Sequence, residues 1–422
     1  MHRIIAASLA AAPCAAMAQT PADLPPSAQS AQSVLTLEQA VAAAGGSAPA
    51  VQAAQAGIDA ARAARTVAGL RPNPTVETQV ENFAGSGAYK AFGQAETTVN
   101  FNIPLELGRK RSARIALADA QTSRAMLTAA ITQADIRLQV TQLYIDAIAA
   151  ERRAVTAADQ LRIAGEALRA ASIRVQAGRA SPIEEQRAGV AQINAEAGLE
   201  RARRLLAAAR VNLARRIGQP MEVALDPGAL DILPPPIHGP TAFAAEGTLA
   251  MAAASADLAV ADAGVRMAQS QRVPDIAFGP GLRRLDATND TAAVFSISVP
   301  LPLFNGGSAA VEQAQAQRGM AEAQQRMTAL DVEQAITDAR AEADNAATSA
   351  RAASGPALAA AQEAARIARI GYREGKFGQI DLLDAERTLA ETRVAAIDAL
   401  AAYQNAKARL ERLIAPAPQE DM

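Results

Sequence analysis

The sequence of 422 residues has few side chains that bind soft metals or stack as aromatic rings. It contains no tryptophan, one cysteine (Cys14) and two histidines (His2 and His238). A single thiol cannot form a disulfide within the chain, and so few histidines and cysteines leave little to hold a transition metal. No nucleophile–base pair and no phosphate-binding loop is apparent. The sequence therefore predicts neither an enzyme nor a bound cofactor or metal.

An excess of one charge and a long apolar run are also missing. The 41 basic and 43 acidic side chains give a net charge of −2, so a nucleic-acid partner has no electrostatic support. No segment after the N-terminal region reaches the roughly 18 uninterrupted apolar residues of a membrane-spanning helix. If the chain is exported, we expect it to be either soluble in the periplasm or inserted in a membrane as β-strands.

The apolar half of the composition is rich in alanine. Alanine is the best helix former, but its side chain buries little area. The composition therefore favours helices packed closely along their length over a compact globular core.

The N-terminus has the pattern of a secretory signal peptide over residues 1–18. A positive start and an apolar run precede an Ala-x-Ala cleavage pattern at residues 16–18. An alternative is that Cys14 carries a lipid anchor, which Pro13 and the short leader disfavour. Residues 19–35, rich in Pro, Ala, Gln and Ser, are expected to be a flexible segment.

The longest predicted element is one helix over residues 108–176. These 69 residues contain no proline, and a helix of that length spans about 100 Å. Mainly apolar residues recur in it at alternating steps of four and three: Leu127, Ile131, Ala134, Leu138, Thr141, Ile145 and Ile148. This heptad pattern predicts a partner helix alongside.

The same plan occurs twice in the chain. Pro104 and Pro300 stand in similar segments 196 residues apart, and Gly178 and Gly375 end similar helices 197 residues apart. Such matches indicate a tandem duplication. We expect a first repeat over residues 36–217, a proline-rich connector over 218–248, a second repeat over 249–414 and a tail over 415–422.

Each repeat contains a predicted β-hairpin, at about residues 72–104 and 274–302. Apolar and polar residues alternate there, with Val99, Phe101 and Ile103 on one face. Such strands, about 10–12 residues long, are typical of a barrel wall between lipid and water. The alternative is an amphipathic hairpin packed on soluble helices.

Each repeat then continues into a long helical hairpin, at about residues 108–217 and 307–414. Ser181 and Glu184 form a capping-box pattern after the first turn. We also expect a kink at residues 354–356, which contain Pro356. Earlier in the chain, a short helix from residue 36 is expected to stop at about Ala44, before Gly45 and Gly46, and a second helix is expected from about residues 49 to 68.

Four strands are too few for a barrel, because about eight are the practical minimum. Their free edges would also be unsatisfied in lipid. The sheet must therefore be shared between copies of the chain and continued by helices with shared seams. The expected assembly is a tube, and the obvious function of a tube is conduction.

The sequence resembles the TolC-like outer-membrane factor family over essentially all of the chain after the signal peptide. The Pro-Asn-Pro motif at residues 72–74, residues 104–114 and residues 299–305 resemble the CzcC-type channels of heavy-metal efflux. The usual motif has a second glycine where Arg109 stands. The resemblance implies a mainly α fold with a β-barrel part: a homotrimer with a shared 12-stranded outer-membrane barrel, four strands per protomer, above a periplasmic barrel of antiparallel coiled coils. It also implies contact with outer-membrane lipid and two protein partners, a periplasmic adaptor and an inner-membrane RND transporter.

Residues 372–385 resemble the periplasmic helical tip of that family. The resemblance implies that Asp381 and Asp384 line a closed aperture and that Tyr372 helps to hold it closed. Residues three apart share a helix face, and a ring of carboxylates favours cations. Each has a plainer alternative: a helix-dipole role for Asp381, a solvated surface for Asp384 and interhelical packing for Tyr372. The family often has a basic residue where Phe377 stands, so the sequence predicts no salt-bridge lock at that position.

A glycine-containing turn joins the two helices of each helical hairpin. In this interpretation both turns would contact the adaptor. The residues expected there are Gly178, Arg179, Ser181, Gly375, Lys376, Phe377 and Gly378. The predicted function is a passive efflux channel, with heavy-metal cations as the favoured cargo. The alternatives are a channel for drugs or other organic compounds, a type I secretion channel, and a soluble periplasmic coiled-coil adaptor.

Overall fold

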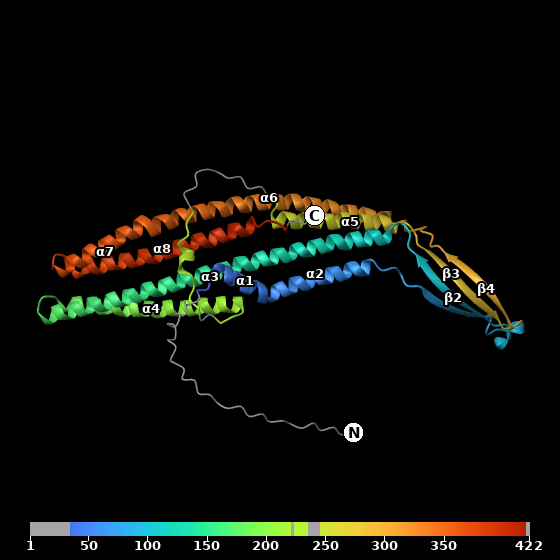
Figure 1. Cartoon of the computed structure of the whole chain (residues 1–422), viewed down its shortest axis with the longest axis horizontal. Coiled ribbons are helices and arrows are strands. Elements are labelled where there is room, and N and C mark those ends of the chain that lie inside the picture. Colours follow the sequence, from blue (N-terminus) through green and yellow to red (C-terminus); the bar gives the residue numbers. More distant parts are fainter. Residues whose placement is uncertain (1–33, 221–222, 235–244, 419–422) are drawn as a thin grey trace, which may run out of the picture.

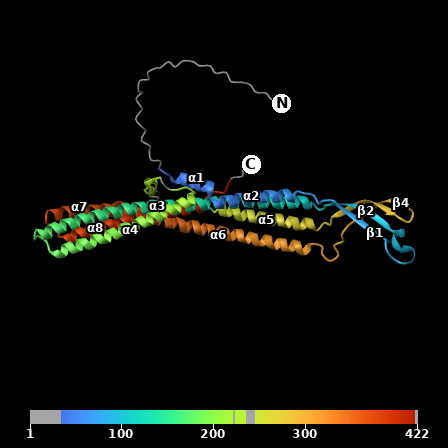
Figure 2. The same cartoon turned by 90° about the horizontal axis from the view of Figure 1, so that it is seen from below.

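A computed structural model describes residues 34–220, 223–234 and 245–418 of the chain. The expected signal peptide, Cys14, most of the flexible segment, parts of the connector and the last four residues lie outside the described residues. The described part is a long rod with a β-sheet at one end and two helical turns at the other (Figures 1 and 2). We call the helical end the tip.

The two repeats have the same order of elements, with two strands followed by long helices. The first repeat contains α1 (Leu37–Ser47), α2 (Pro49–Ala68), β1 (Thr75–Glu81), β2 (Glu96–Leu105), α3 (Lys110–Gln176) and α4 (Pro182–Ile217). The second contains α5 (Leu249–Gln271), β3 (Ile276–Leu285), β4 (Asp290–Ser298), α6 (Ser308–Ala352), α7 (Leu358–Arg373) and α8 (Gln379–Leu413). A π-helical turn (Ala353–Ala357) joins α6 to α7 and contains Pro356, the position of the expected kink.

Two local predictions differ from the structure. Helix α1 continues through Gly45 and Gly46, and the break comes at Ala48, immediately before Pro49 begins α2. Glycine only weakens a helix, whereas proline has no amide proton to continue one. Strand β1, with 7 residues, is shorter than the length of about 10–12 residues expected for the strands of the first hairpin, whereas β2, with 10 residues, agrees with it.

The four strands form one antiparallel sheet in the order β1-β2-β3-β4. Val99 lies opposite Leu282, and Phe278 lies opposite Ile297. The side chains on this face are apolar and largely exposed in the single chain. On the other face Arg283 makes ion pairs with Glu81 and Glu96. The sheet therefore has one apolar and one polar face, and the outer edges of its edge strands β1 and β4 have no partner strand among the described residues.

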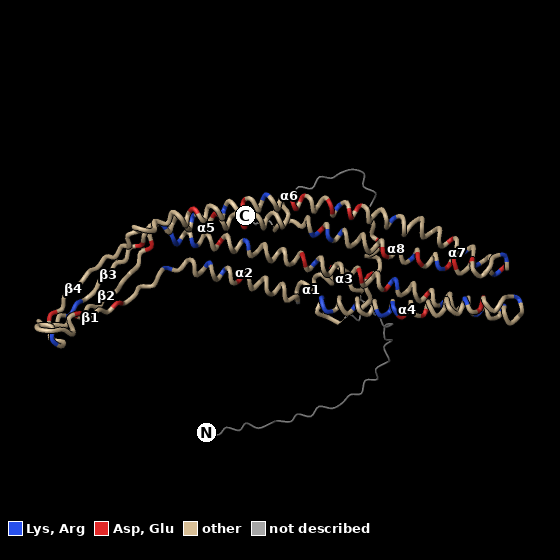
Figure 3. The backbone as a smooth tube through the Cα atoms, turned by 180° about the vertical axis from the view of Figure 1, so that it is seen from behind, with Lys and Arg blue, Asp and Glu red and all other residues tan. Residues whose placement is uncertain are grey.

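The helices nearest the sheet lie side by side in the order α2, α3, α5 and α6. Nearer the tip, α3 packs against α4 and α8, while α7 packs against α8. Helix α3 has 67 residues and runs along most of the rod at about 1.5 Å per residue. Basic and acidic residues are interspersed along the helices (Figure 3). Because α2 and α6 are the first and last helices in the order given above, they form the two outer edges of the half beside the sheet.

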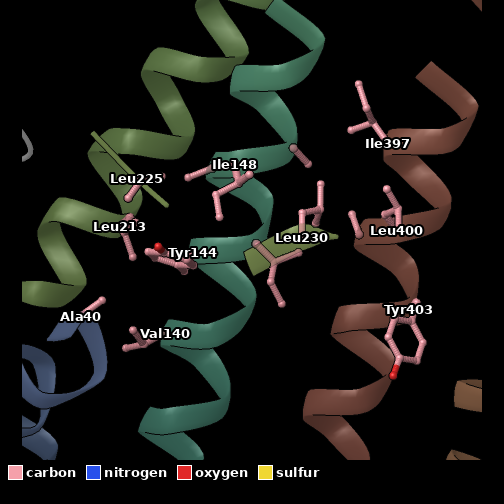
Figure 4. Packing of buried hydrophobic residues seen from close by; sticks show 14 of the residues in the cluster. Ala40, Val140, Tyr144, Ile148, Leu213, Leu225, Leu230, Ile397, Leu400 and Tyr403 are labelled. Atoms are coloured by element: carbon pink, nitrogen blue, oxygen red, sulfur yellow. The ribbon is translucent and has the colours of Figure 1, made fainter. Parts of the chain in front are cut away.

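The largest buried side chains gather midway along the rod (Figure 4). Tyr144 is fully buried beside Leu213 and Leu230, and burial raises the pKa of its phenol. Its hydroxyl donates to the Leu35 carbonyl oxygen (2.7 Å) and accepts from the Asp226 amide (3.1 Å). Part of the connector, expected only as a break, therefore completes this core.

A polar network joins the sheet to the helices, within the motif at residues 104–114. Arg114 pairs with Glu106 and donates to the Leu70 carbonyl oxygen (3.0 Å), while Lys110 pairs with Asp275 (2.7 Å). The hydrogen bond from Arg114 is the main reason that the pKa of Glu106 is lowered. These contacts hold the end of α2 and the first turn of α3 at the foot of the sheet.

Arg109 stands where the family motif has a second glycine, and it has a φ of +59°. Gly108 before it has a φ of +69°, and a Cβ there would lie 2.6 Å from the Cβ of Val273. Two successive left-handed residues favour glycine at both positions. Arg109 therefore adopts a left-handed backbone conformation. This conformation explains why the family motif usually has glycine at the same position.

Candidate functional site at the helical tip

The α3–α4 turn is closed by backbone hydrogen bonds around Gly178. The Arg179 amide donates to the Arg174 carbonyl oxygen (2.8 Å), and the Gly178 amide donates to that of Val175 (2.9 Å). Gly178 has a φ of +68°, which glycine adopts without strain. This Schellman-type ending turns the chain sharply and leaves Arg179 exposed at the tip.

The α7–α8 turn has the same construction. Gly375 has a φ of +72°, and the Lys376 amide donates to the Gly371 carbonyl oxygen (2.8 Å). The Phe377 ring lies over Gly371, where an added Cβ would be 2.1 Å from a ring carbon. Lys376 pairs with Glu374 (2.7 Å). The tandem repeat therefore places two similar turns at one end of the molecule.

Asp381 and Asp384 are both exposed on the first turns of α8. The Gly378 amide donates to Oδ2 of Asp381 (2.9 Å). Asp381 thus caps the helix start, a role close to the plainer helix-dipole alternative considered from the sequence. Asp384 is one turn further along and is not needed for this cap.

Tyr372 faces inward from α7 and is 9% exposed. It packs with Ala368 and Leu382, and the guanidinium of Arg174 lies 4.9 Å from its ring centroid. Its hydroxyl is buried without a hydrogen-bond partner among the described residues. Interhelical packing is therefore visible for this tyrosine, and its hydroxyl is left free for a further partner.

The predicted capping box at Ser181 is wrong. Ser181 is the N-cap residue of α4, but its side chain makes no capping hydrogen bond. The Glu184 amide instead donates to the Ser181 carbonyl oxygen (2.9 Å). Oε2 of Glu184 is buried without a partner among the described residues. Helix α4 starts with Pro182 at its first turn, so the start does not depend on the serine side chain.

Contacts between the two hairpins were missed from the sequence. Gln379 donates to the Glu184 carbonyl oxygen (2.9 Å), and Arg174 stacks on Tyr372. These pairs join residues almost 200 positions apart. A heptad pattern reveals that a helix has a partner but not which side chain meets which. The only available signal was the repeat, which placed the two turns at equivalent positions.

The tip carries charge rather than a coordination site. No group of three or more His, Cys, Asp or Glu side chains that could hold a metal ion occurs among the described residues. The tip instead presents exposed acidic and basic side chains on two compact turns. Such an arrangement can influence passing ions electrostatically without binding one tightly. Within the residues that the structure describes, no helix is long and apolar enough to cross a membrane.

Known proteins share both the sequence pattern and the fold. The family model for outer membrane efflux proteins matches residues 40–219 and 244–415. The cobalt-zinc-cadmium resistance protein CzcC of Cupriavidus metallidurans is 31% identical over 90% of this chain and 90% of its own. The nickel and cobalt resistance protein CnrC of the same organism is 29% identical over 63% of this chain and 64% of its own.

Among solved structures, the open state of the MtrE outer membrane channel of Neisseria gonorrhoeae superposes with a TM-score of 0.73. It is 20% identical, and the match covers 90% of this chain and 88% of that one. This likeness confirms the predicted TolC-like fold, and the two matched segments confirm the internal repeat. The family model covers most of the sequence, and the relative at 31% identity covers nearly all of it. The chain belongs to the outer membrane efflux protein family.

Proposed function

We propose that the chain is one of three identical protomers of an outer-membrane channel for the export of divalent metal cations. An inner-membrane RND transporter and a periplasmic adaptor would deliver the cargo, and the channel itself would be passive. The observation that carries the proposal is the four-stranded sheet with open edges, one apolar face and direct continuation into long helices.

The sheet supports membrane insertion through its exposed apolar face. Val76 and Phe295 are 66% and 65% exposed in the single chain, and Phe101 and Leu282 lie on the same face. In water such a surface is unfavourable, whereas against lipid it is stable. Three copies would supply twelve strands, enough to close a barrel and pair every edge.

Metal cations as cargo are supported by the relatives and not by a site in this chain. CzcC and CnrC are described as resistance proteins for cobalt, zinc and cadmium and for nickel and cobalt. Histidine and cysteine are nearly absent here, so the choice of ion would rest with the partner proteins.

We place the aperture at Asp381 and Asp384. Three copies would bring six exposed carboxylates to the narrow end of the tube, where they would attract cations. Arg179 and Lys376 on the neighbouring turns would contact the adaptor, together with Gly178, Ser181, Gly375, Phe377 and Gly378.

Purification from outer membranes tests the function directly. We expect a detergent-soluble trimer that forms ion-conducting pores in planar bilayers, and a deletion strain that is more sensitive to zinc, cobalt or cadmium. A soluble monomer would reject the channel. A normal metal response together with sensitivity to organic compounds would transfer the proposal to drug efflux.

The aperture is tested by replacing Asp381 and Asp384 together with alanine. Single-channel conductance should rise and cation preference should weaken. Glu333→Ala on α6, far from the tip, is the matched control and should leave both unchanged. Unaltered conductance in the double variant would remove these residues from the aperture.

The adaptor contact is tested by the charge reversals Arg179→Glu and Lys376→Glu in one chain. Metal resistance should fall, while trimer yield and pore conductance in bilayers stay as in the parent. Full resistance in cells would place the adaptor contact elsewhere.

A further inference from the structure

The polar face of the sheet carries charges of both signs in unequal number. Within the four described strands, Arg283 is the one basic residue on this face, and the acidic residues are Glu77, Glu81, Glu96 and Asp290. In the proposed channel the apolar face meets lipid, so the polar face lines the lumen. The barrel would therefore have an acidic interior to which each copy of the chain adds a single cation.

Arg283 lies where two carboxylates are brought close together. Glu81 ends β1, Glu96 begins β2, and the two stand directly opposite each other at the end of the sheet farthest from the helices (Figure 1). Like charges in such positions repel and destabilise a sheet. Nη1 of Arg283 lies 2.8 Å from Oε2 of Glu96, and Nη2 lies 3.4 Å from Oε2 of Glu81. The guanidinium therefore connects three strands and offsets the repulsion.

The other oxygen of each carboxylate also has a partner. Oε1 of Glu96 accepts a hydrogen bond from the side chain of Asn82 (3.4 Å). Oε1 of Glu81 accepts one from the side chain of Gln79 (3.2 Å). All four oxygens thus lie beside a donor of the same chain. A divalent metal ion binds to carboxylate oxygens, so it would first have to displace one of these partners.

The side chain of Arg283 runs along the sheet and is held there by a third contact. Its Nε donates to Oγ1 of Thr98 on β2 (2.9 Å), and this threonine is 2% exposed. The donors of a guanidinium point in fixed directions within one plane, so three contacts leave it little freedom. Arg283 therefore stays beside both carboxylates instead of extending into the lumen.

The same face of β3 is covered by small uncharged side chains next to Arg283. The two preceding positions are Gly281 and Gly279, over which the side chains of Asn100 and Ser296 lie. A Cβ on Gly281 would be 2.0 Å from Oδ1 of Asn100, and one on Gly279 would be 2.2 Å from Oγ of Ser296. An ion passing this strand would therefore meet no charge on it before that of Arg283.

We propose that Arg283 determines how the outer end of the lumen treats cations. One guanidinium and two carboxylates leave a net charge of −1 in each copy, which attracts cations. At the same time the guanidinium occupies the place between Glu81 and Glu96 that a divalent cation would otherwise fill. Conduction requires that an ion both enters and leaves. The inference rests on the proposed function and deepens it, because it names a residue that keeps metal cargo from being trapped.

Recordings of the full-length trimer in planar bilayers, with Arg283→Gln, test the inference. In a KCl gradient the reversal potential should shift toward that of potassium, because each copy loses a positive charge from the lumen. Zinc chloride in the bath should lower the conductance at concentrations that leave the parent unaffected. The reason is that Glu81 and Glu96 would then be free to hold the ion between them.

The neighbouring arginine provides the matched control. Arg284 lies on the apolar face and pairs with Asp286 (3.2 Å), so Arg284→Gln should behave as the parent in both measurements. In the double variant Arg283→Gln with Glu81→Gln, the block by zinc should disappear, because the pair of opposed carboxylates is gone. This reversal distinguishes trapping of the ion from a general distortion of the barrel.

Glu81→Gln alone keeps the inference testable if Arg283→Gln does not assemble. Glu96 retains its ion pair with Arg283 in this variant, so the sheet should still form. The cluster then has no net charge, and the cation preference should fall below that of the parent. An unchanged preference would overturn the inference.

The outcomes also separate this inference from the proposed function. Stronger cation preference and block by zinc in Arg283→Gln, with neither in Arg284→Gln, would support it. Conducting pores of Arg283→Gln that keep the reversal potential of the parent, or that zinc does not block, would overturn it and leave the channel itself in place. A parent protein that forms no pores would reject the channel, and the inference with it.

Discussion

The middle of the rod and its tip share helices α3 and α8 but differ in how each satisfies its buried tyrosine. Tyr144, in the middle, is fully buried, and its hydroxyl makes two hydrogen bonds. Tyr372, at the tip, is also buried, but its hydroxyl has no partner among the described residues, and the same holds for Oε2 of Glu184 and Oε1 of Gln379. Unpaired buried polar groups cost about 1–3 kcal/mol each.

The comparison teaches that the tyrosine hydroxyl of the middle is satisfied within a single chain and that of the tip is not, although Nε of Arg210, Nε of Arg216 and Oδ1 of Asn405, nearer the middle, are also buried without a partner among the described residues. Large side chains from four segments fill the middle, whereas the tip cluster consists of alanines with Tyr372 and Leu382. A region with unpaired buried groups can gain stability from a neighbour or by changing shape. The tip, whose core is small and whose buried tyrosine hydroxyl is unpaired, is therefore easier to rearrange than the large core of the middle.

The largest contrast is expected from truncating leucines. Leu213→Ala should lower the free energy of unfolding by about 2–5 kcal/mol, because Leu213 is fully buried among large neighbours and leaves a cavity. Leu382→Ala should cost less, since the smaller tip cluster can relax around the gap. Thermal unfolding followed by circular dichroism in detergent measures both, and equal losses would contradict the comparison.

Removing one hydroxyl sharpens the contrast. Tyr144→Phe should cost about 1–3 kcal/mol, because the Leu35 carbonyl and the Asp226 amide lose their partner. Tyr372→Phe should cost almost nothing in the single chain. If it destabilises the trimer while leaving the monomer unchanged, the hydroxyl is paired across the protomer interface. A large loss in the monomer would show that the tip is already complete.

Acid should weaken the junction between sheet and helices. The hydrogen bond from Arg114 keeps the folded-state pKa of Glu106 below its ordinary value. Glu106 therefore adds stability above the unfolded-state pKa of about 4.3, and this is lost as the pH falls through the lower folded-state pKa. Between about pH 6 and pH 3, thermal stability should fall more in the parent than in Glu106→Gln. The thermal stability of the control variant Glu333→Gln, at an exposed position on α6, should fall over this pH range as much as that of the parent.

The smallest effect is expected at the two aspartates of the tip. Asp381→Ala should cost about 0.5–1 kcal/mol, because the Gly378 amide loses its acceptor. Asp384→Ala should stay within about 0.5 kcal/mol of the parent, as do most surface substitutions. Unfolding of the two single variants, compared side by side, checks the difference. Equal values would show that the cap contributes nothing.

Features with a local cause were predictable from the sequence. The long helices follow from heptads and from the absence of proline, and the strands follow from alternation with period two. The turn glycines stand where the backbone has a positive φ, at Gly178 and Gly375. The predicted break at Gly45 and Gly46 was wrong, because glycine lowers helix stability without removing a hydrogen bond.

Other features were decided only when distant segments met. Sequence alone determined a doubled plan of hairpins and long amphipathic helices, since each part depends on neighbours a few residues away. The tertiary structure decided that β2 pairs with β3, that Tyr144 joins Leu35 to Asp226, and that Arg174 covers Tyr372. Periodicity indicates which face of a helix is buried, but the residues that meet that face depend on the level of one helix relative to the other along the rod. Side-chain contacts set that level, and they exist only in the folded molecule.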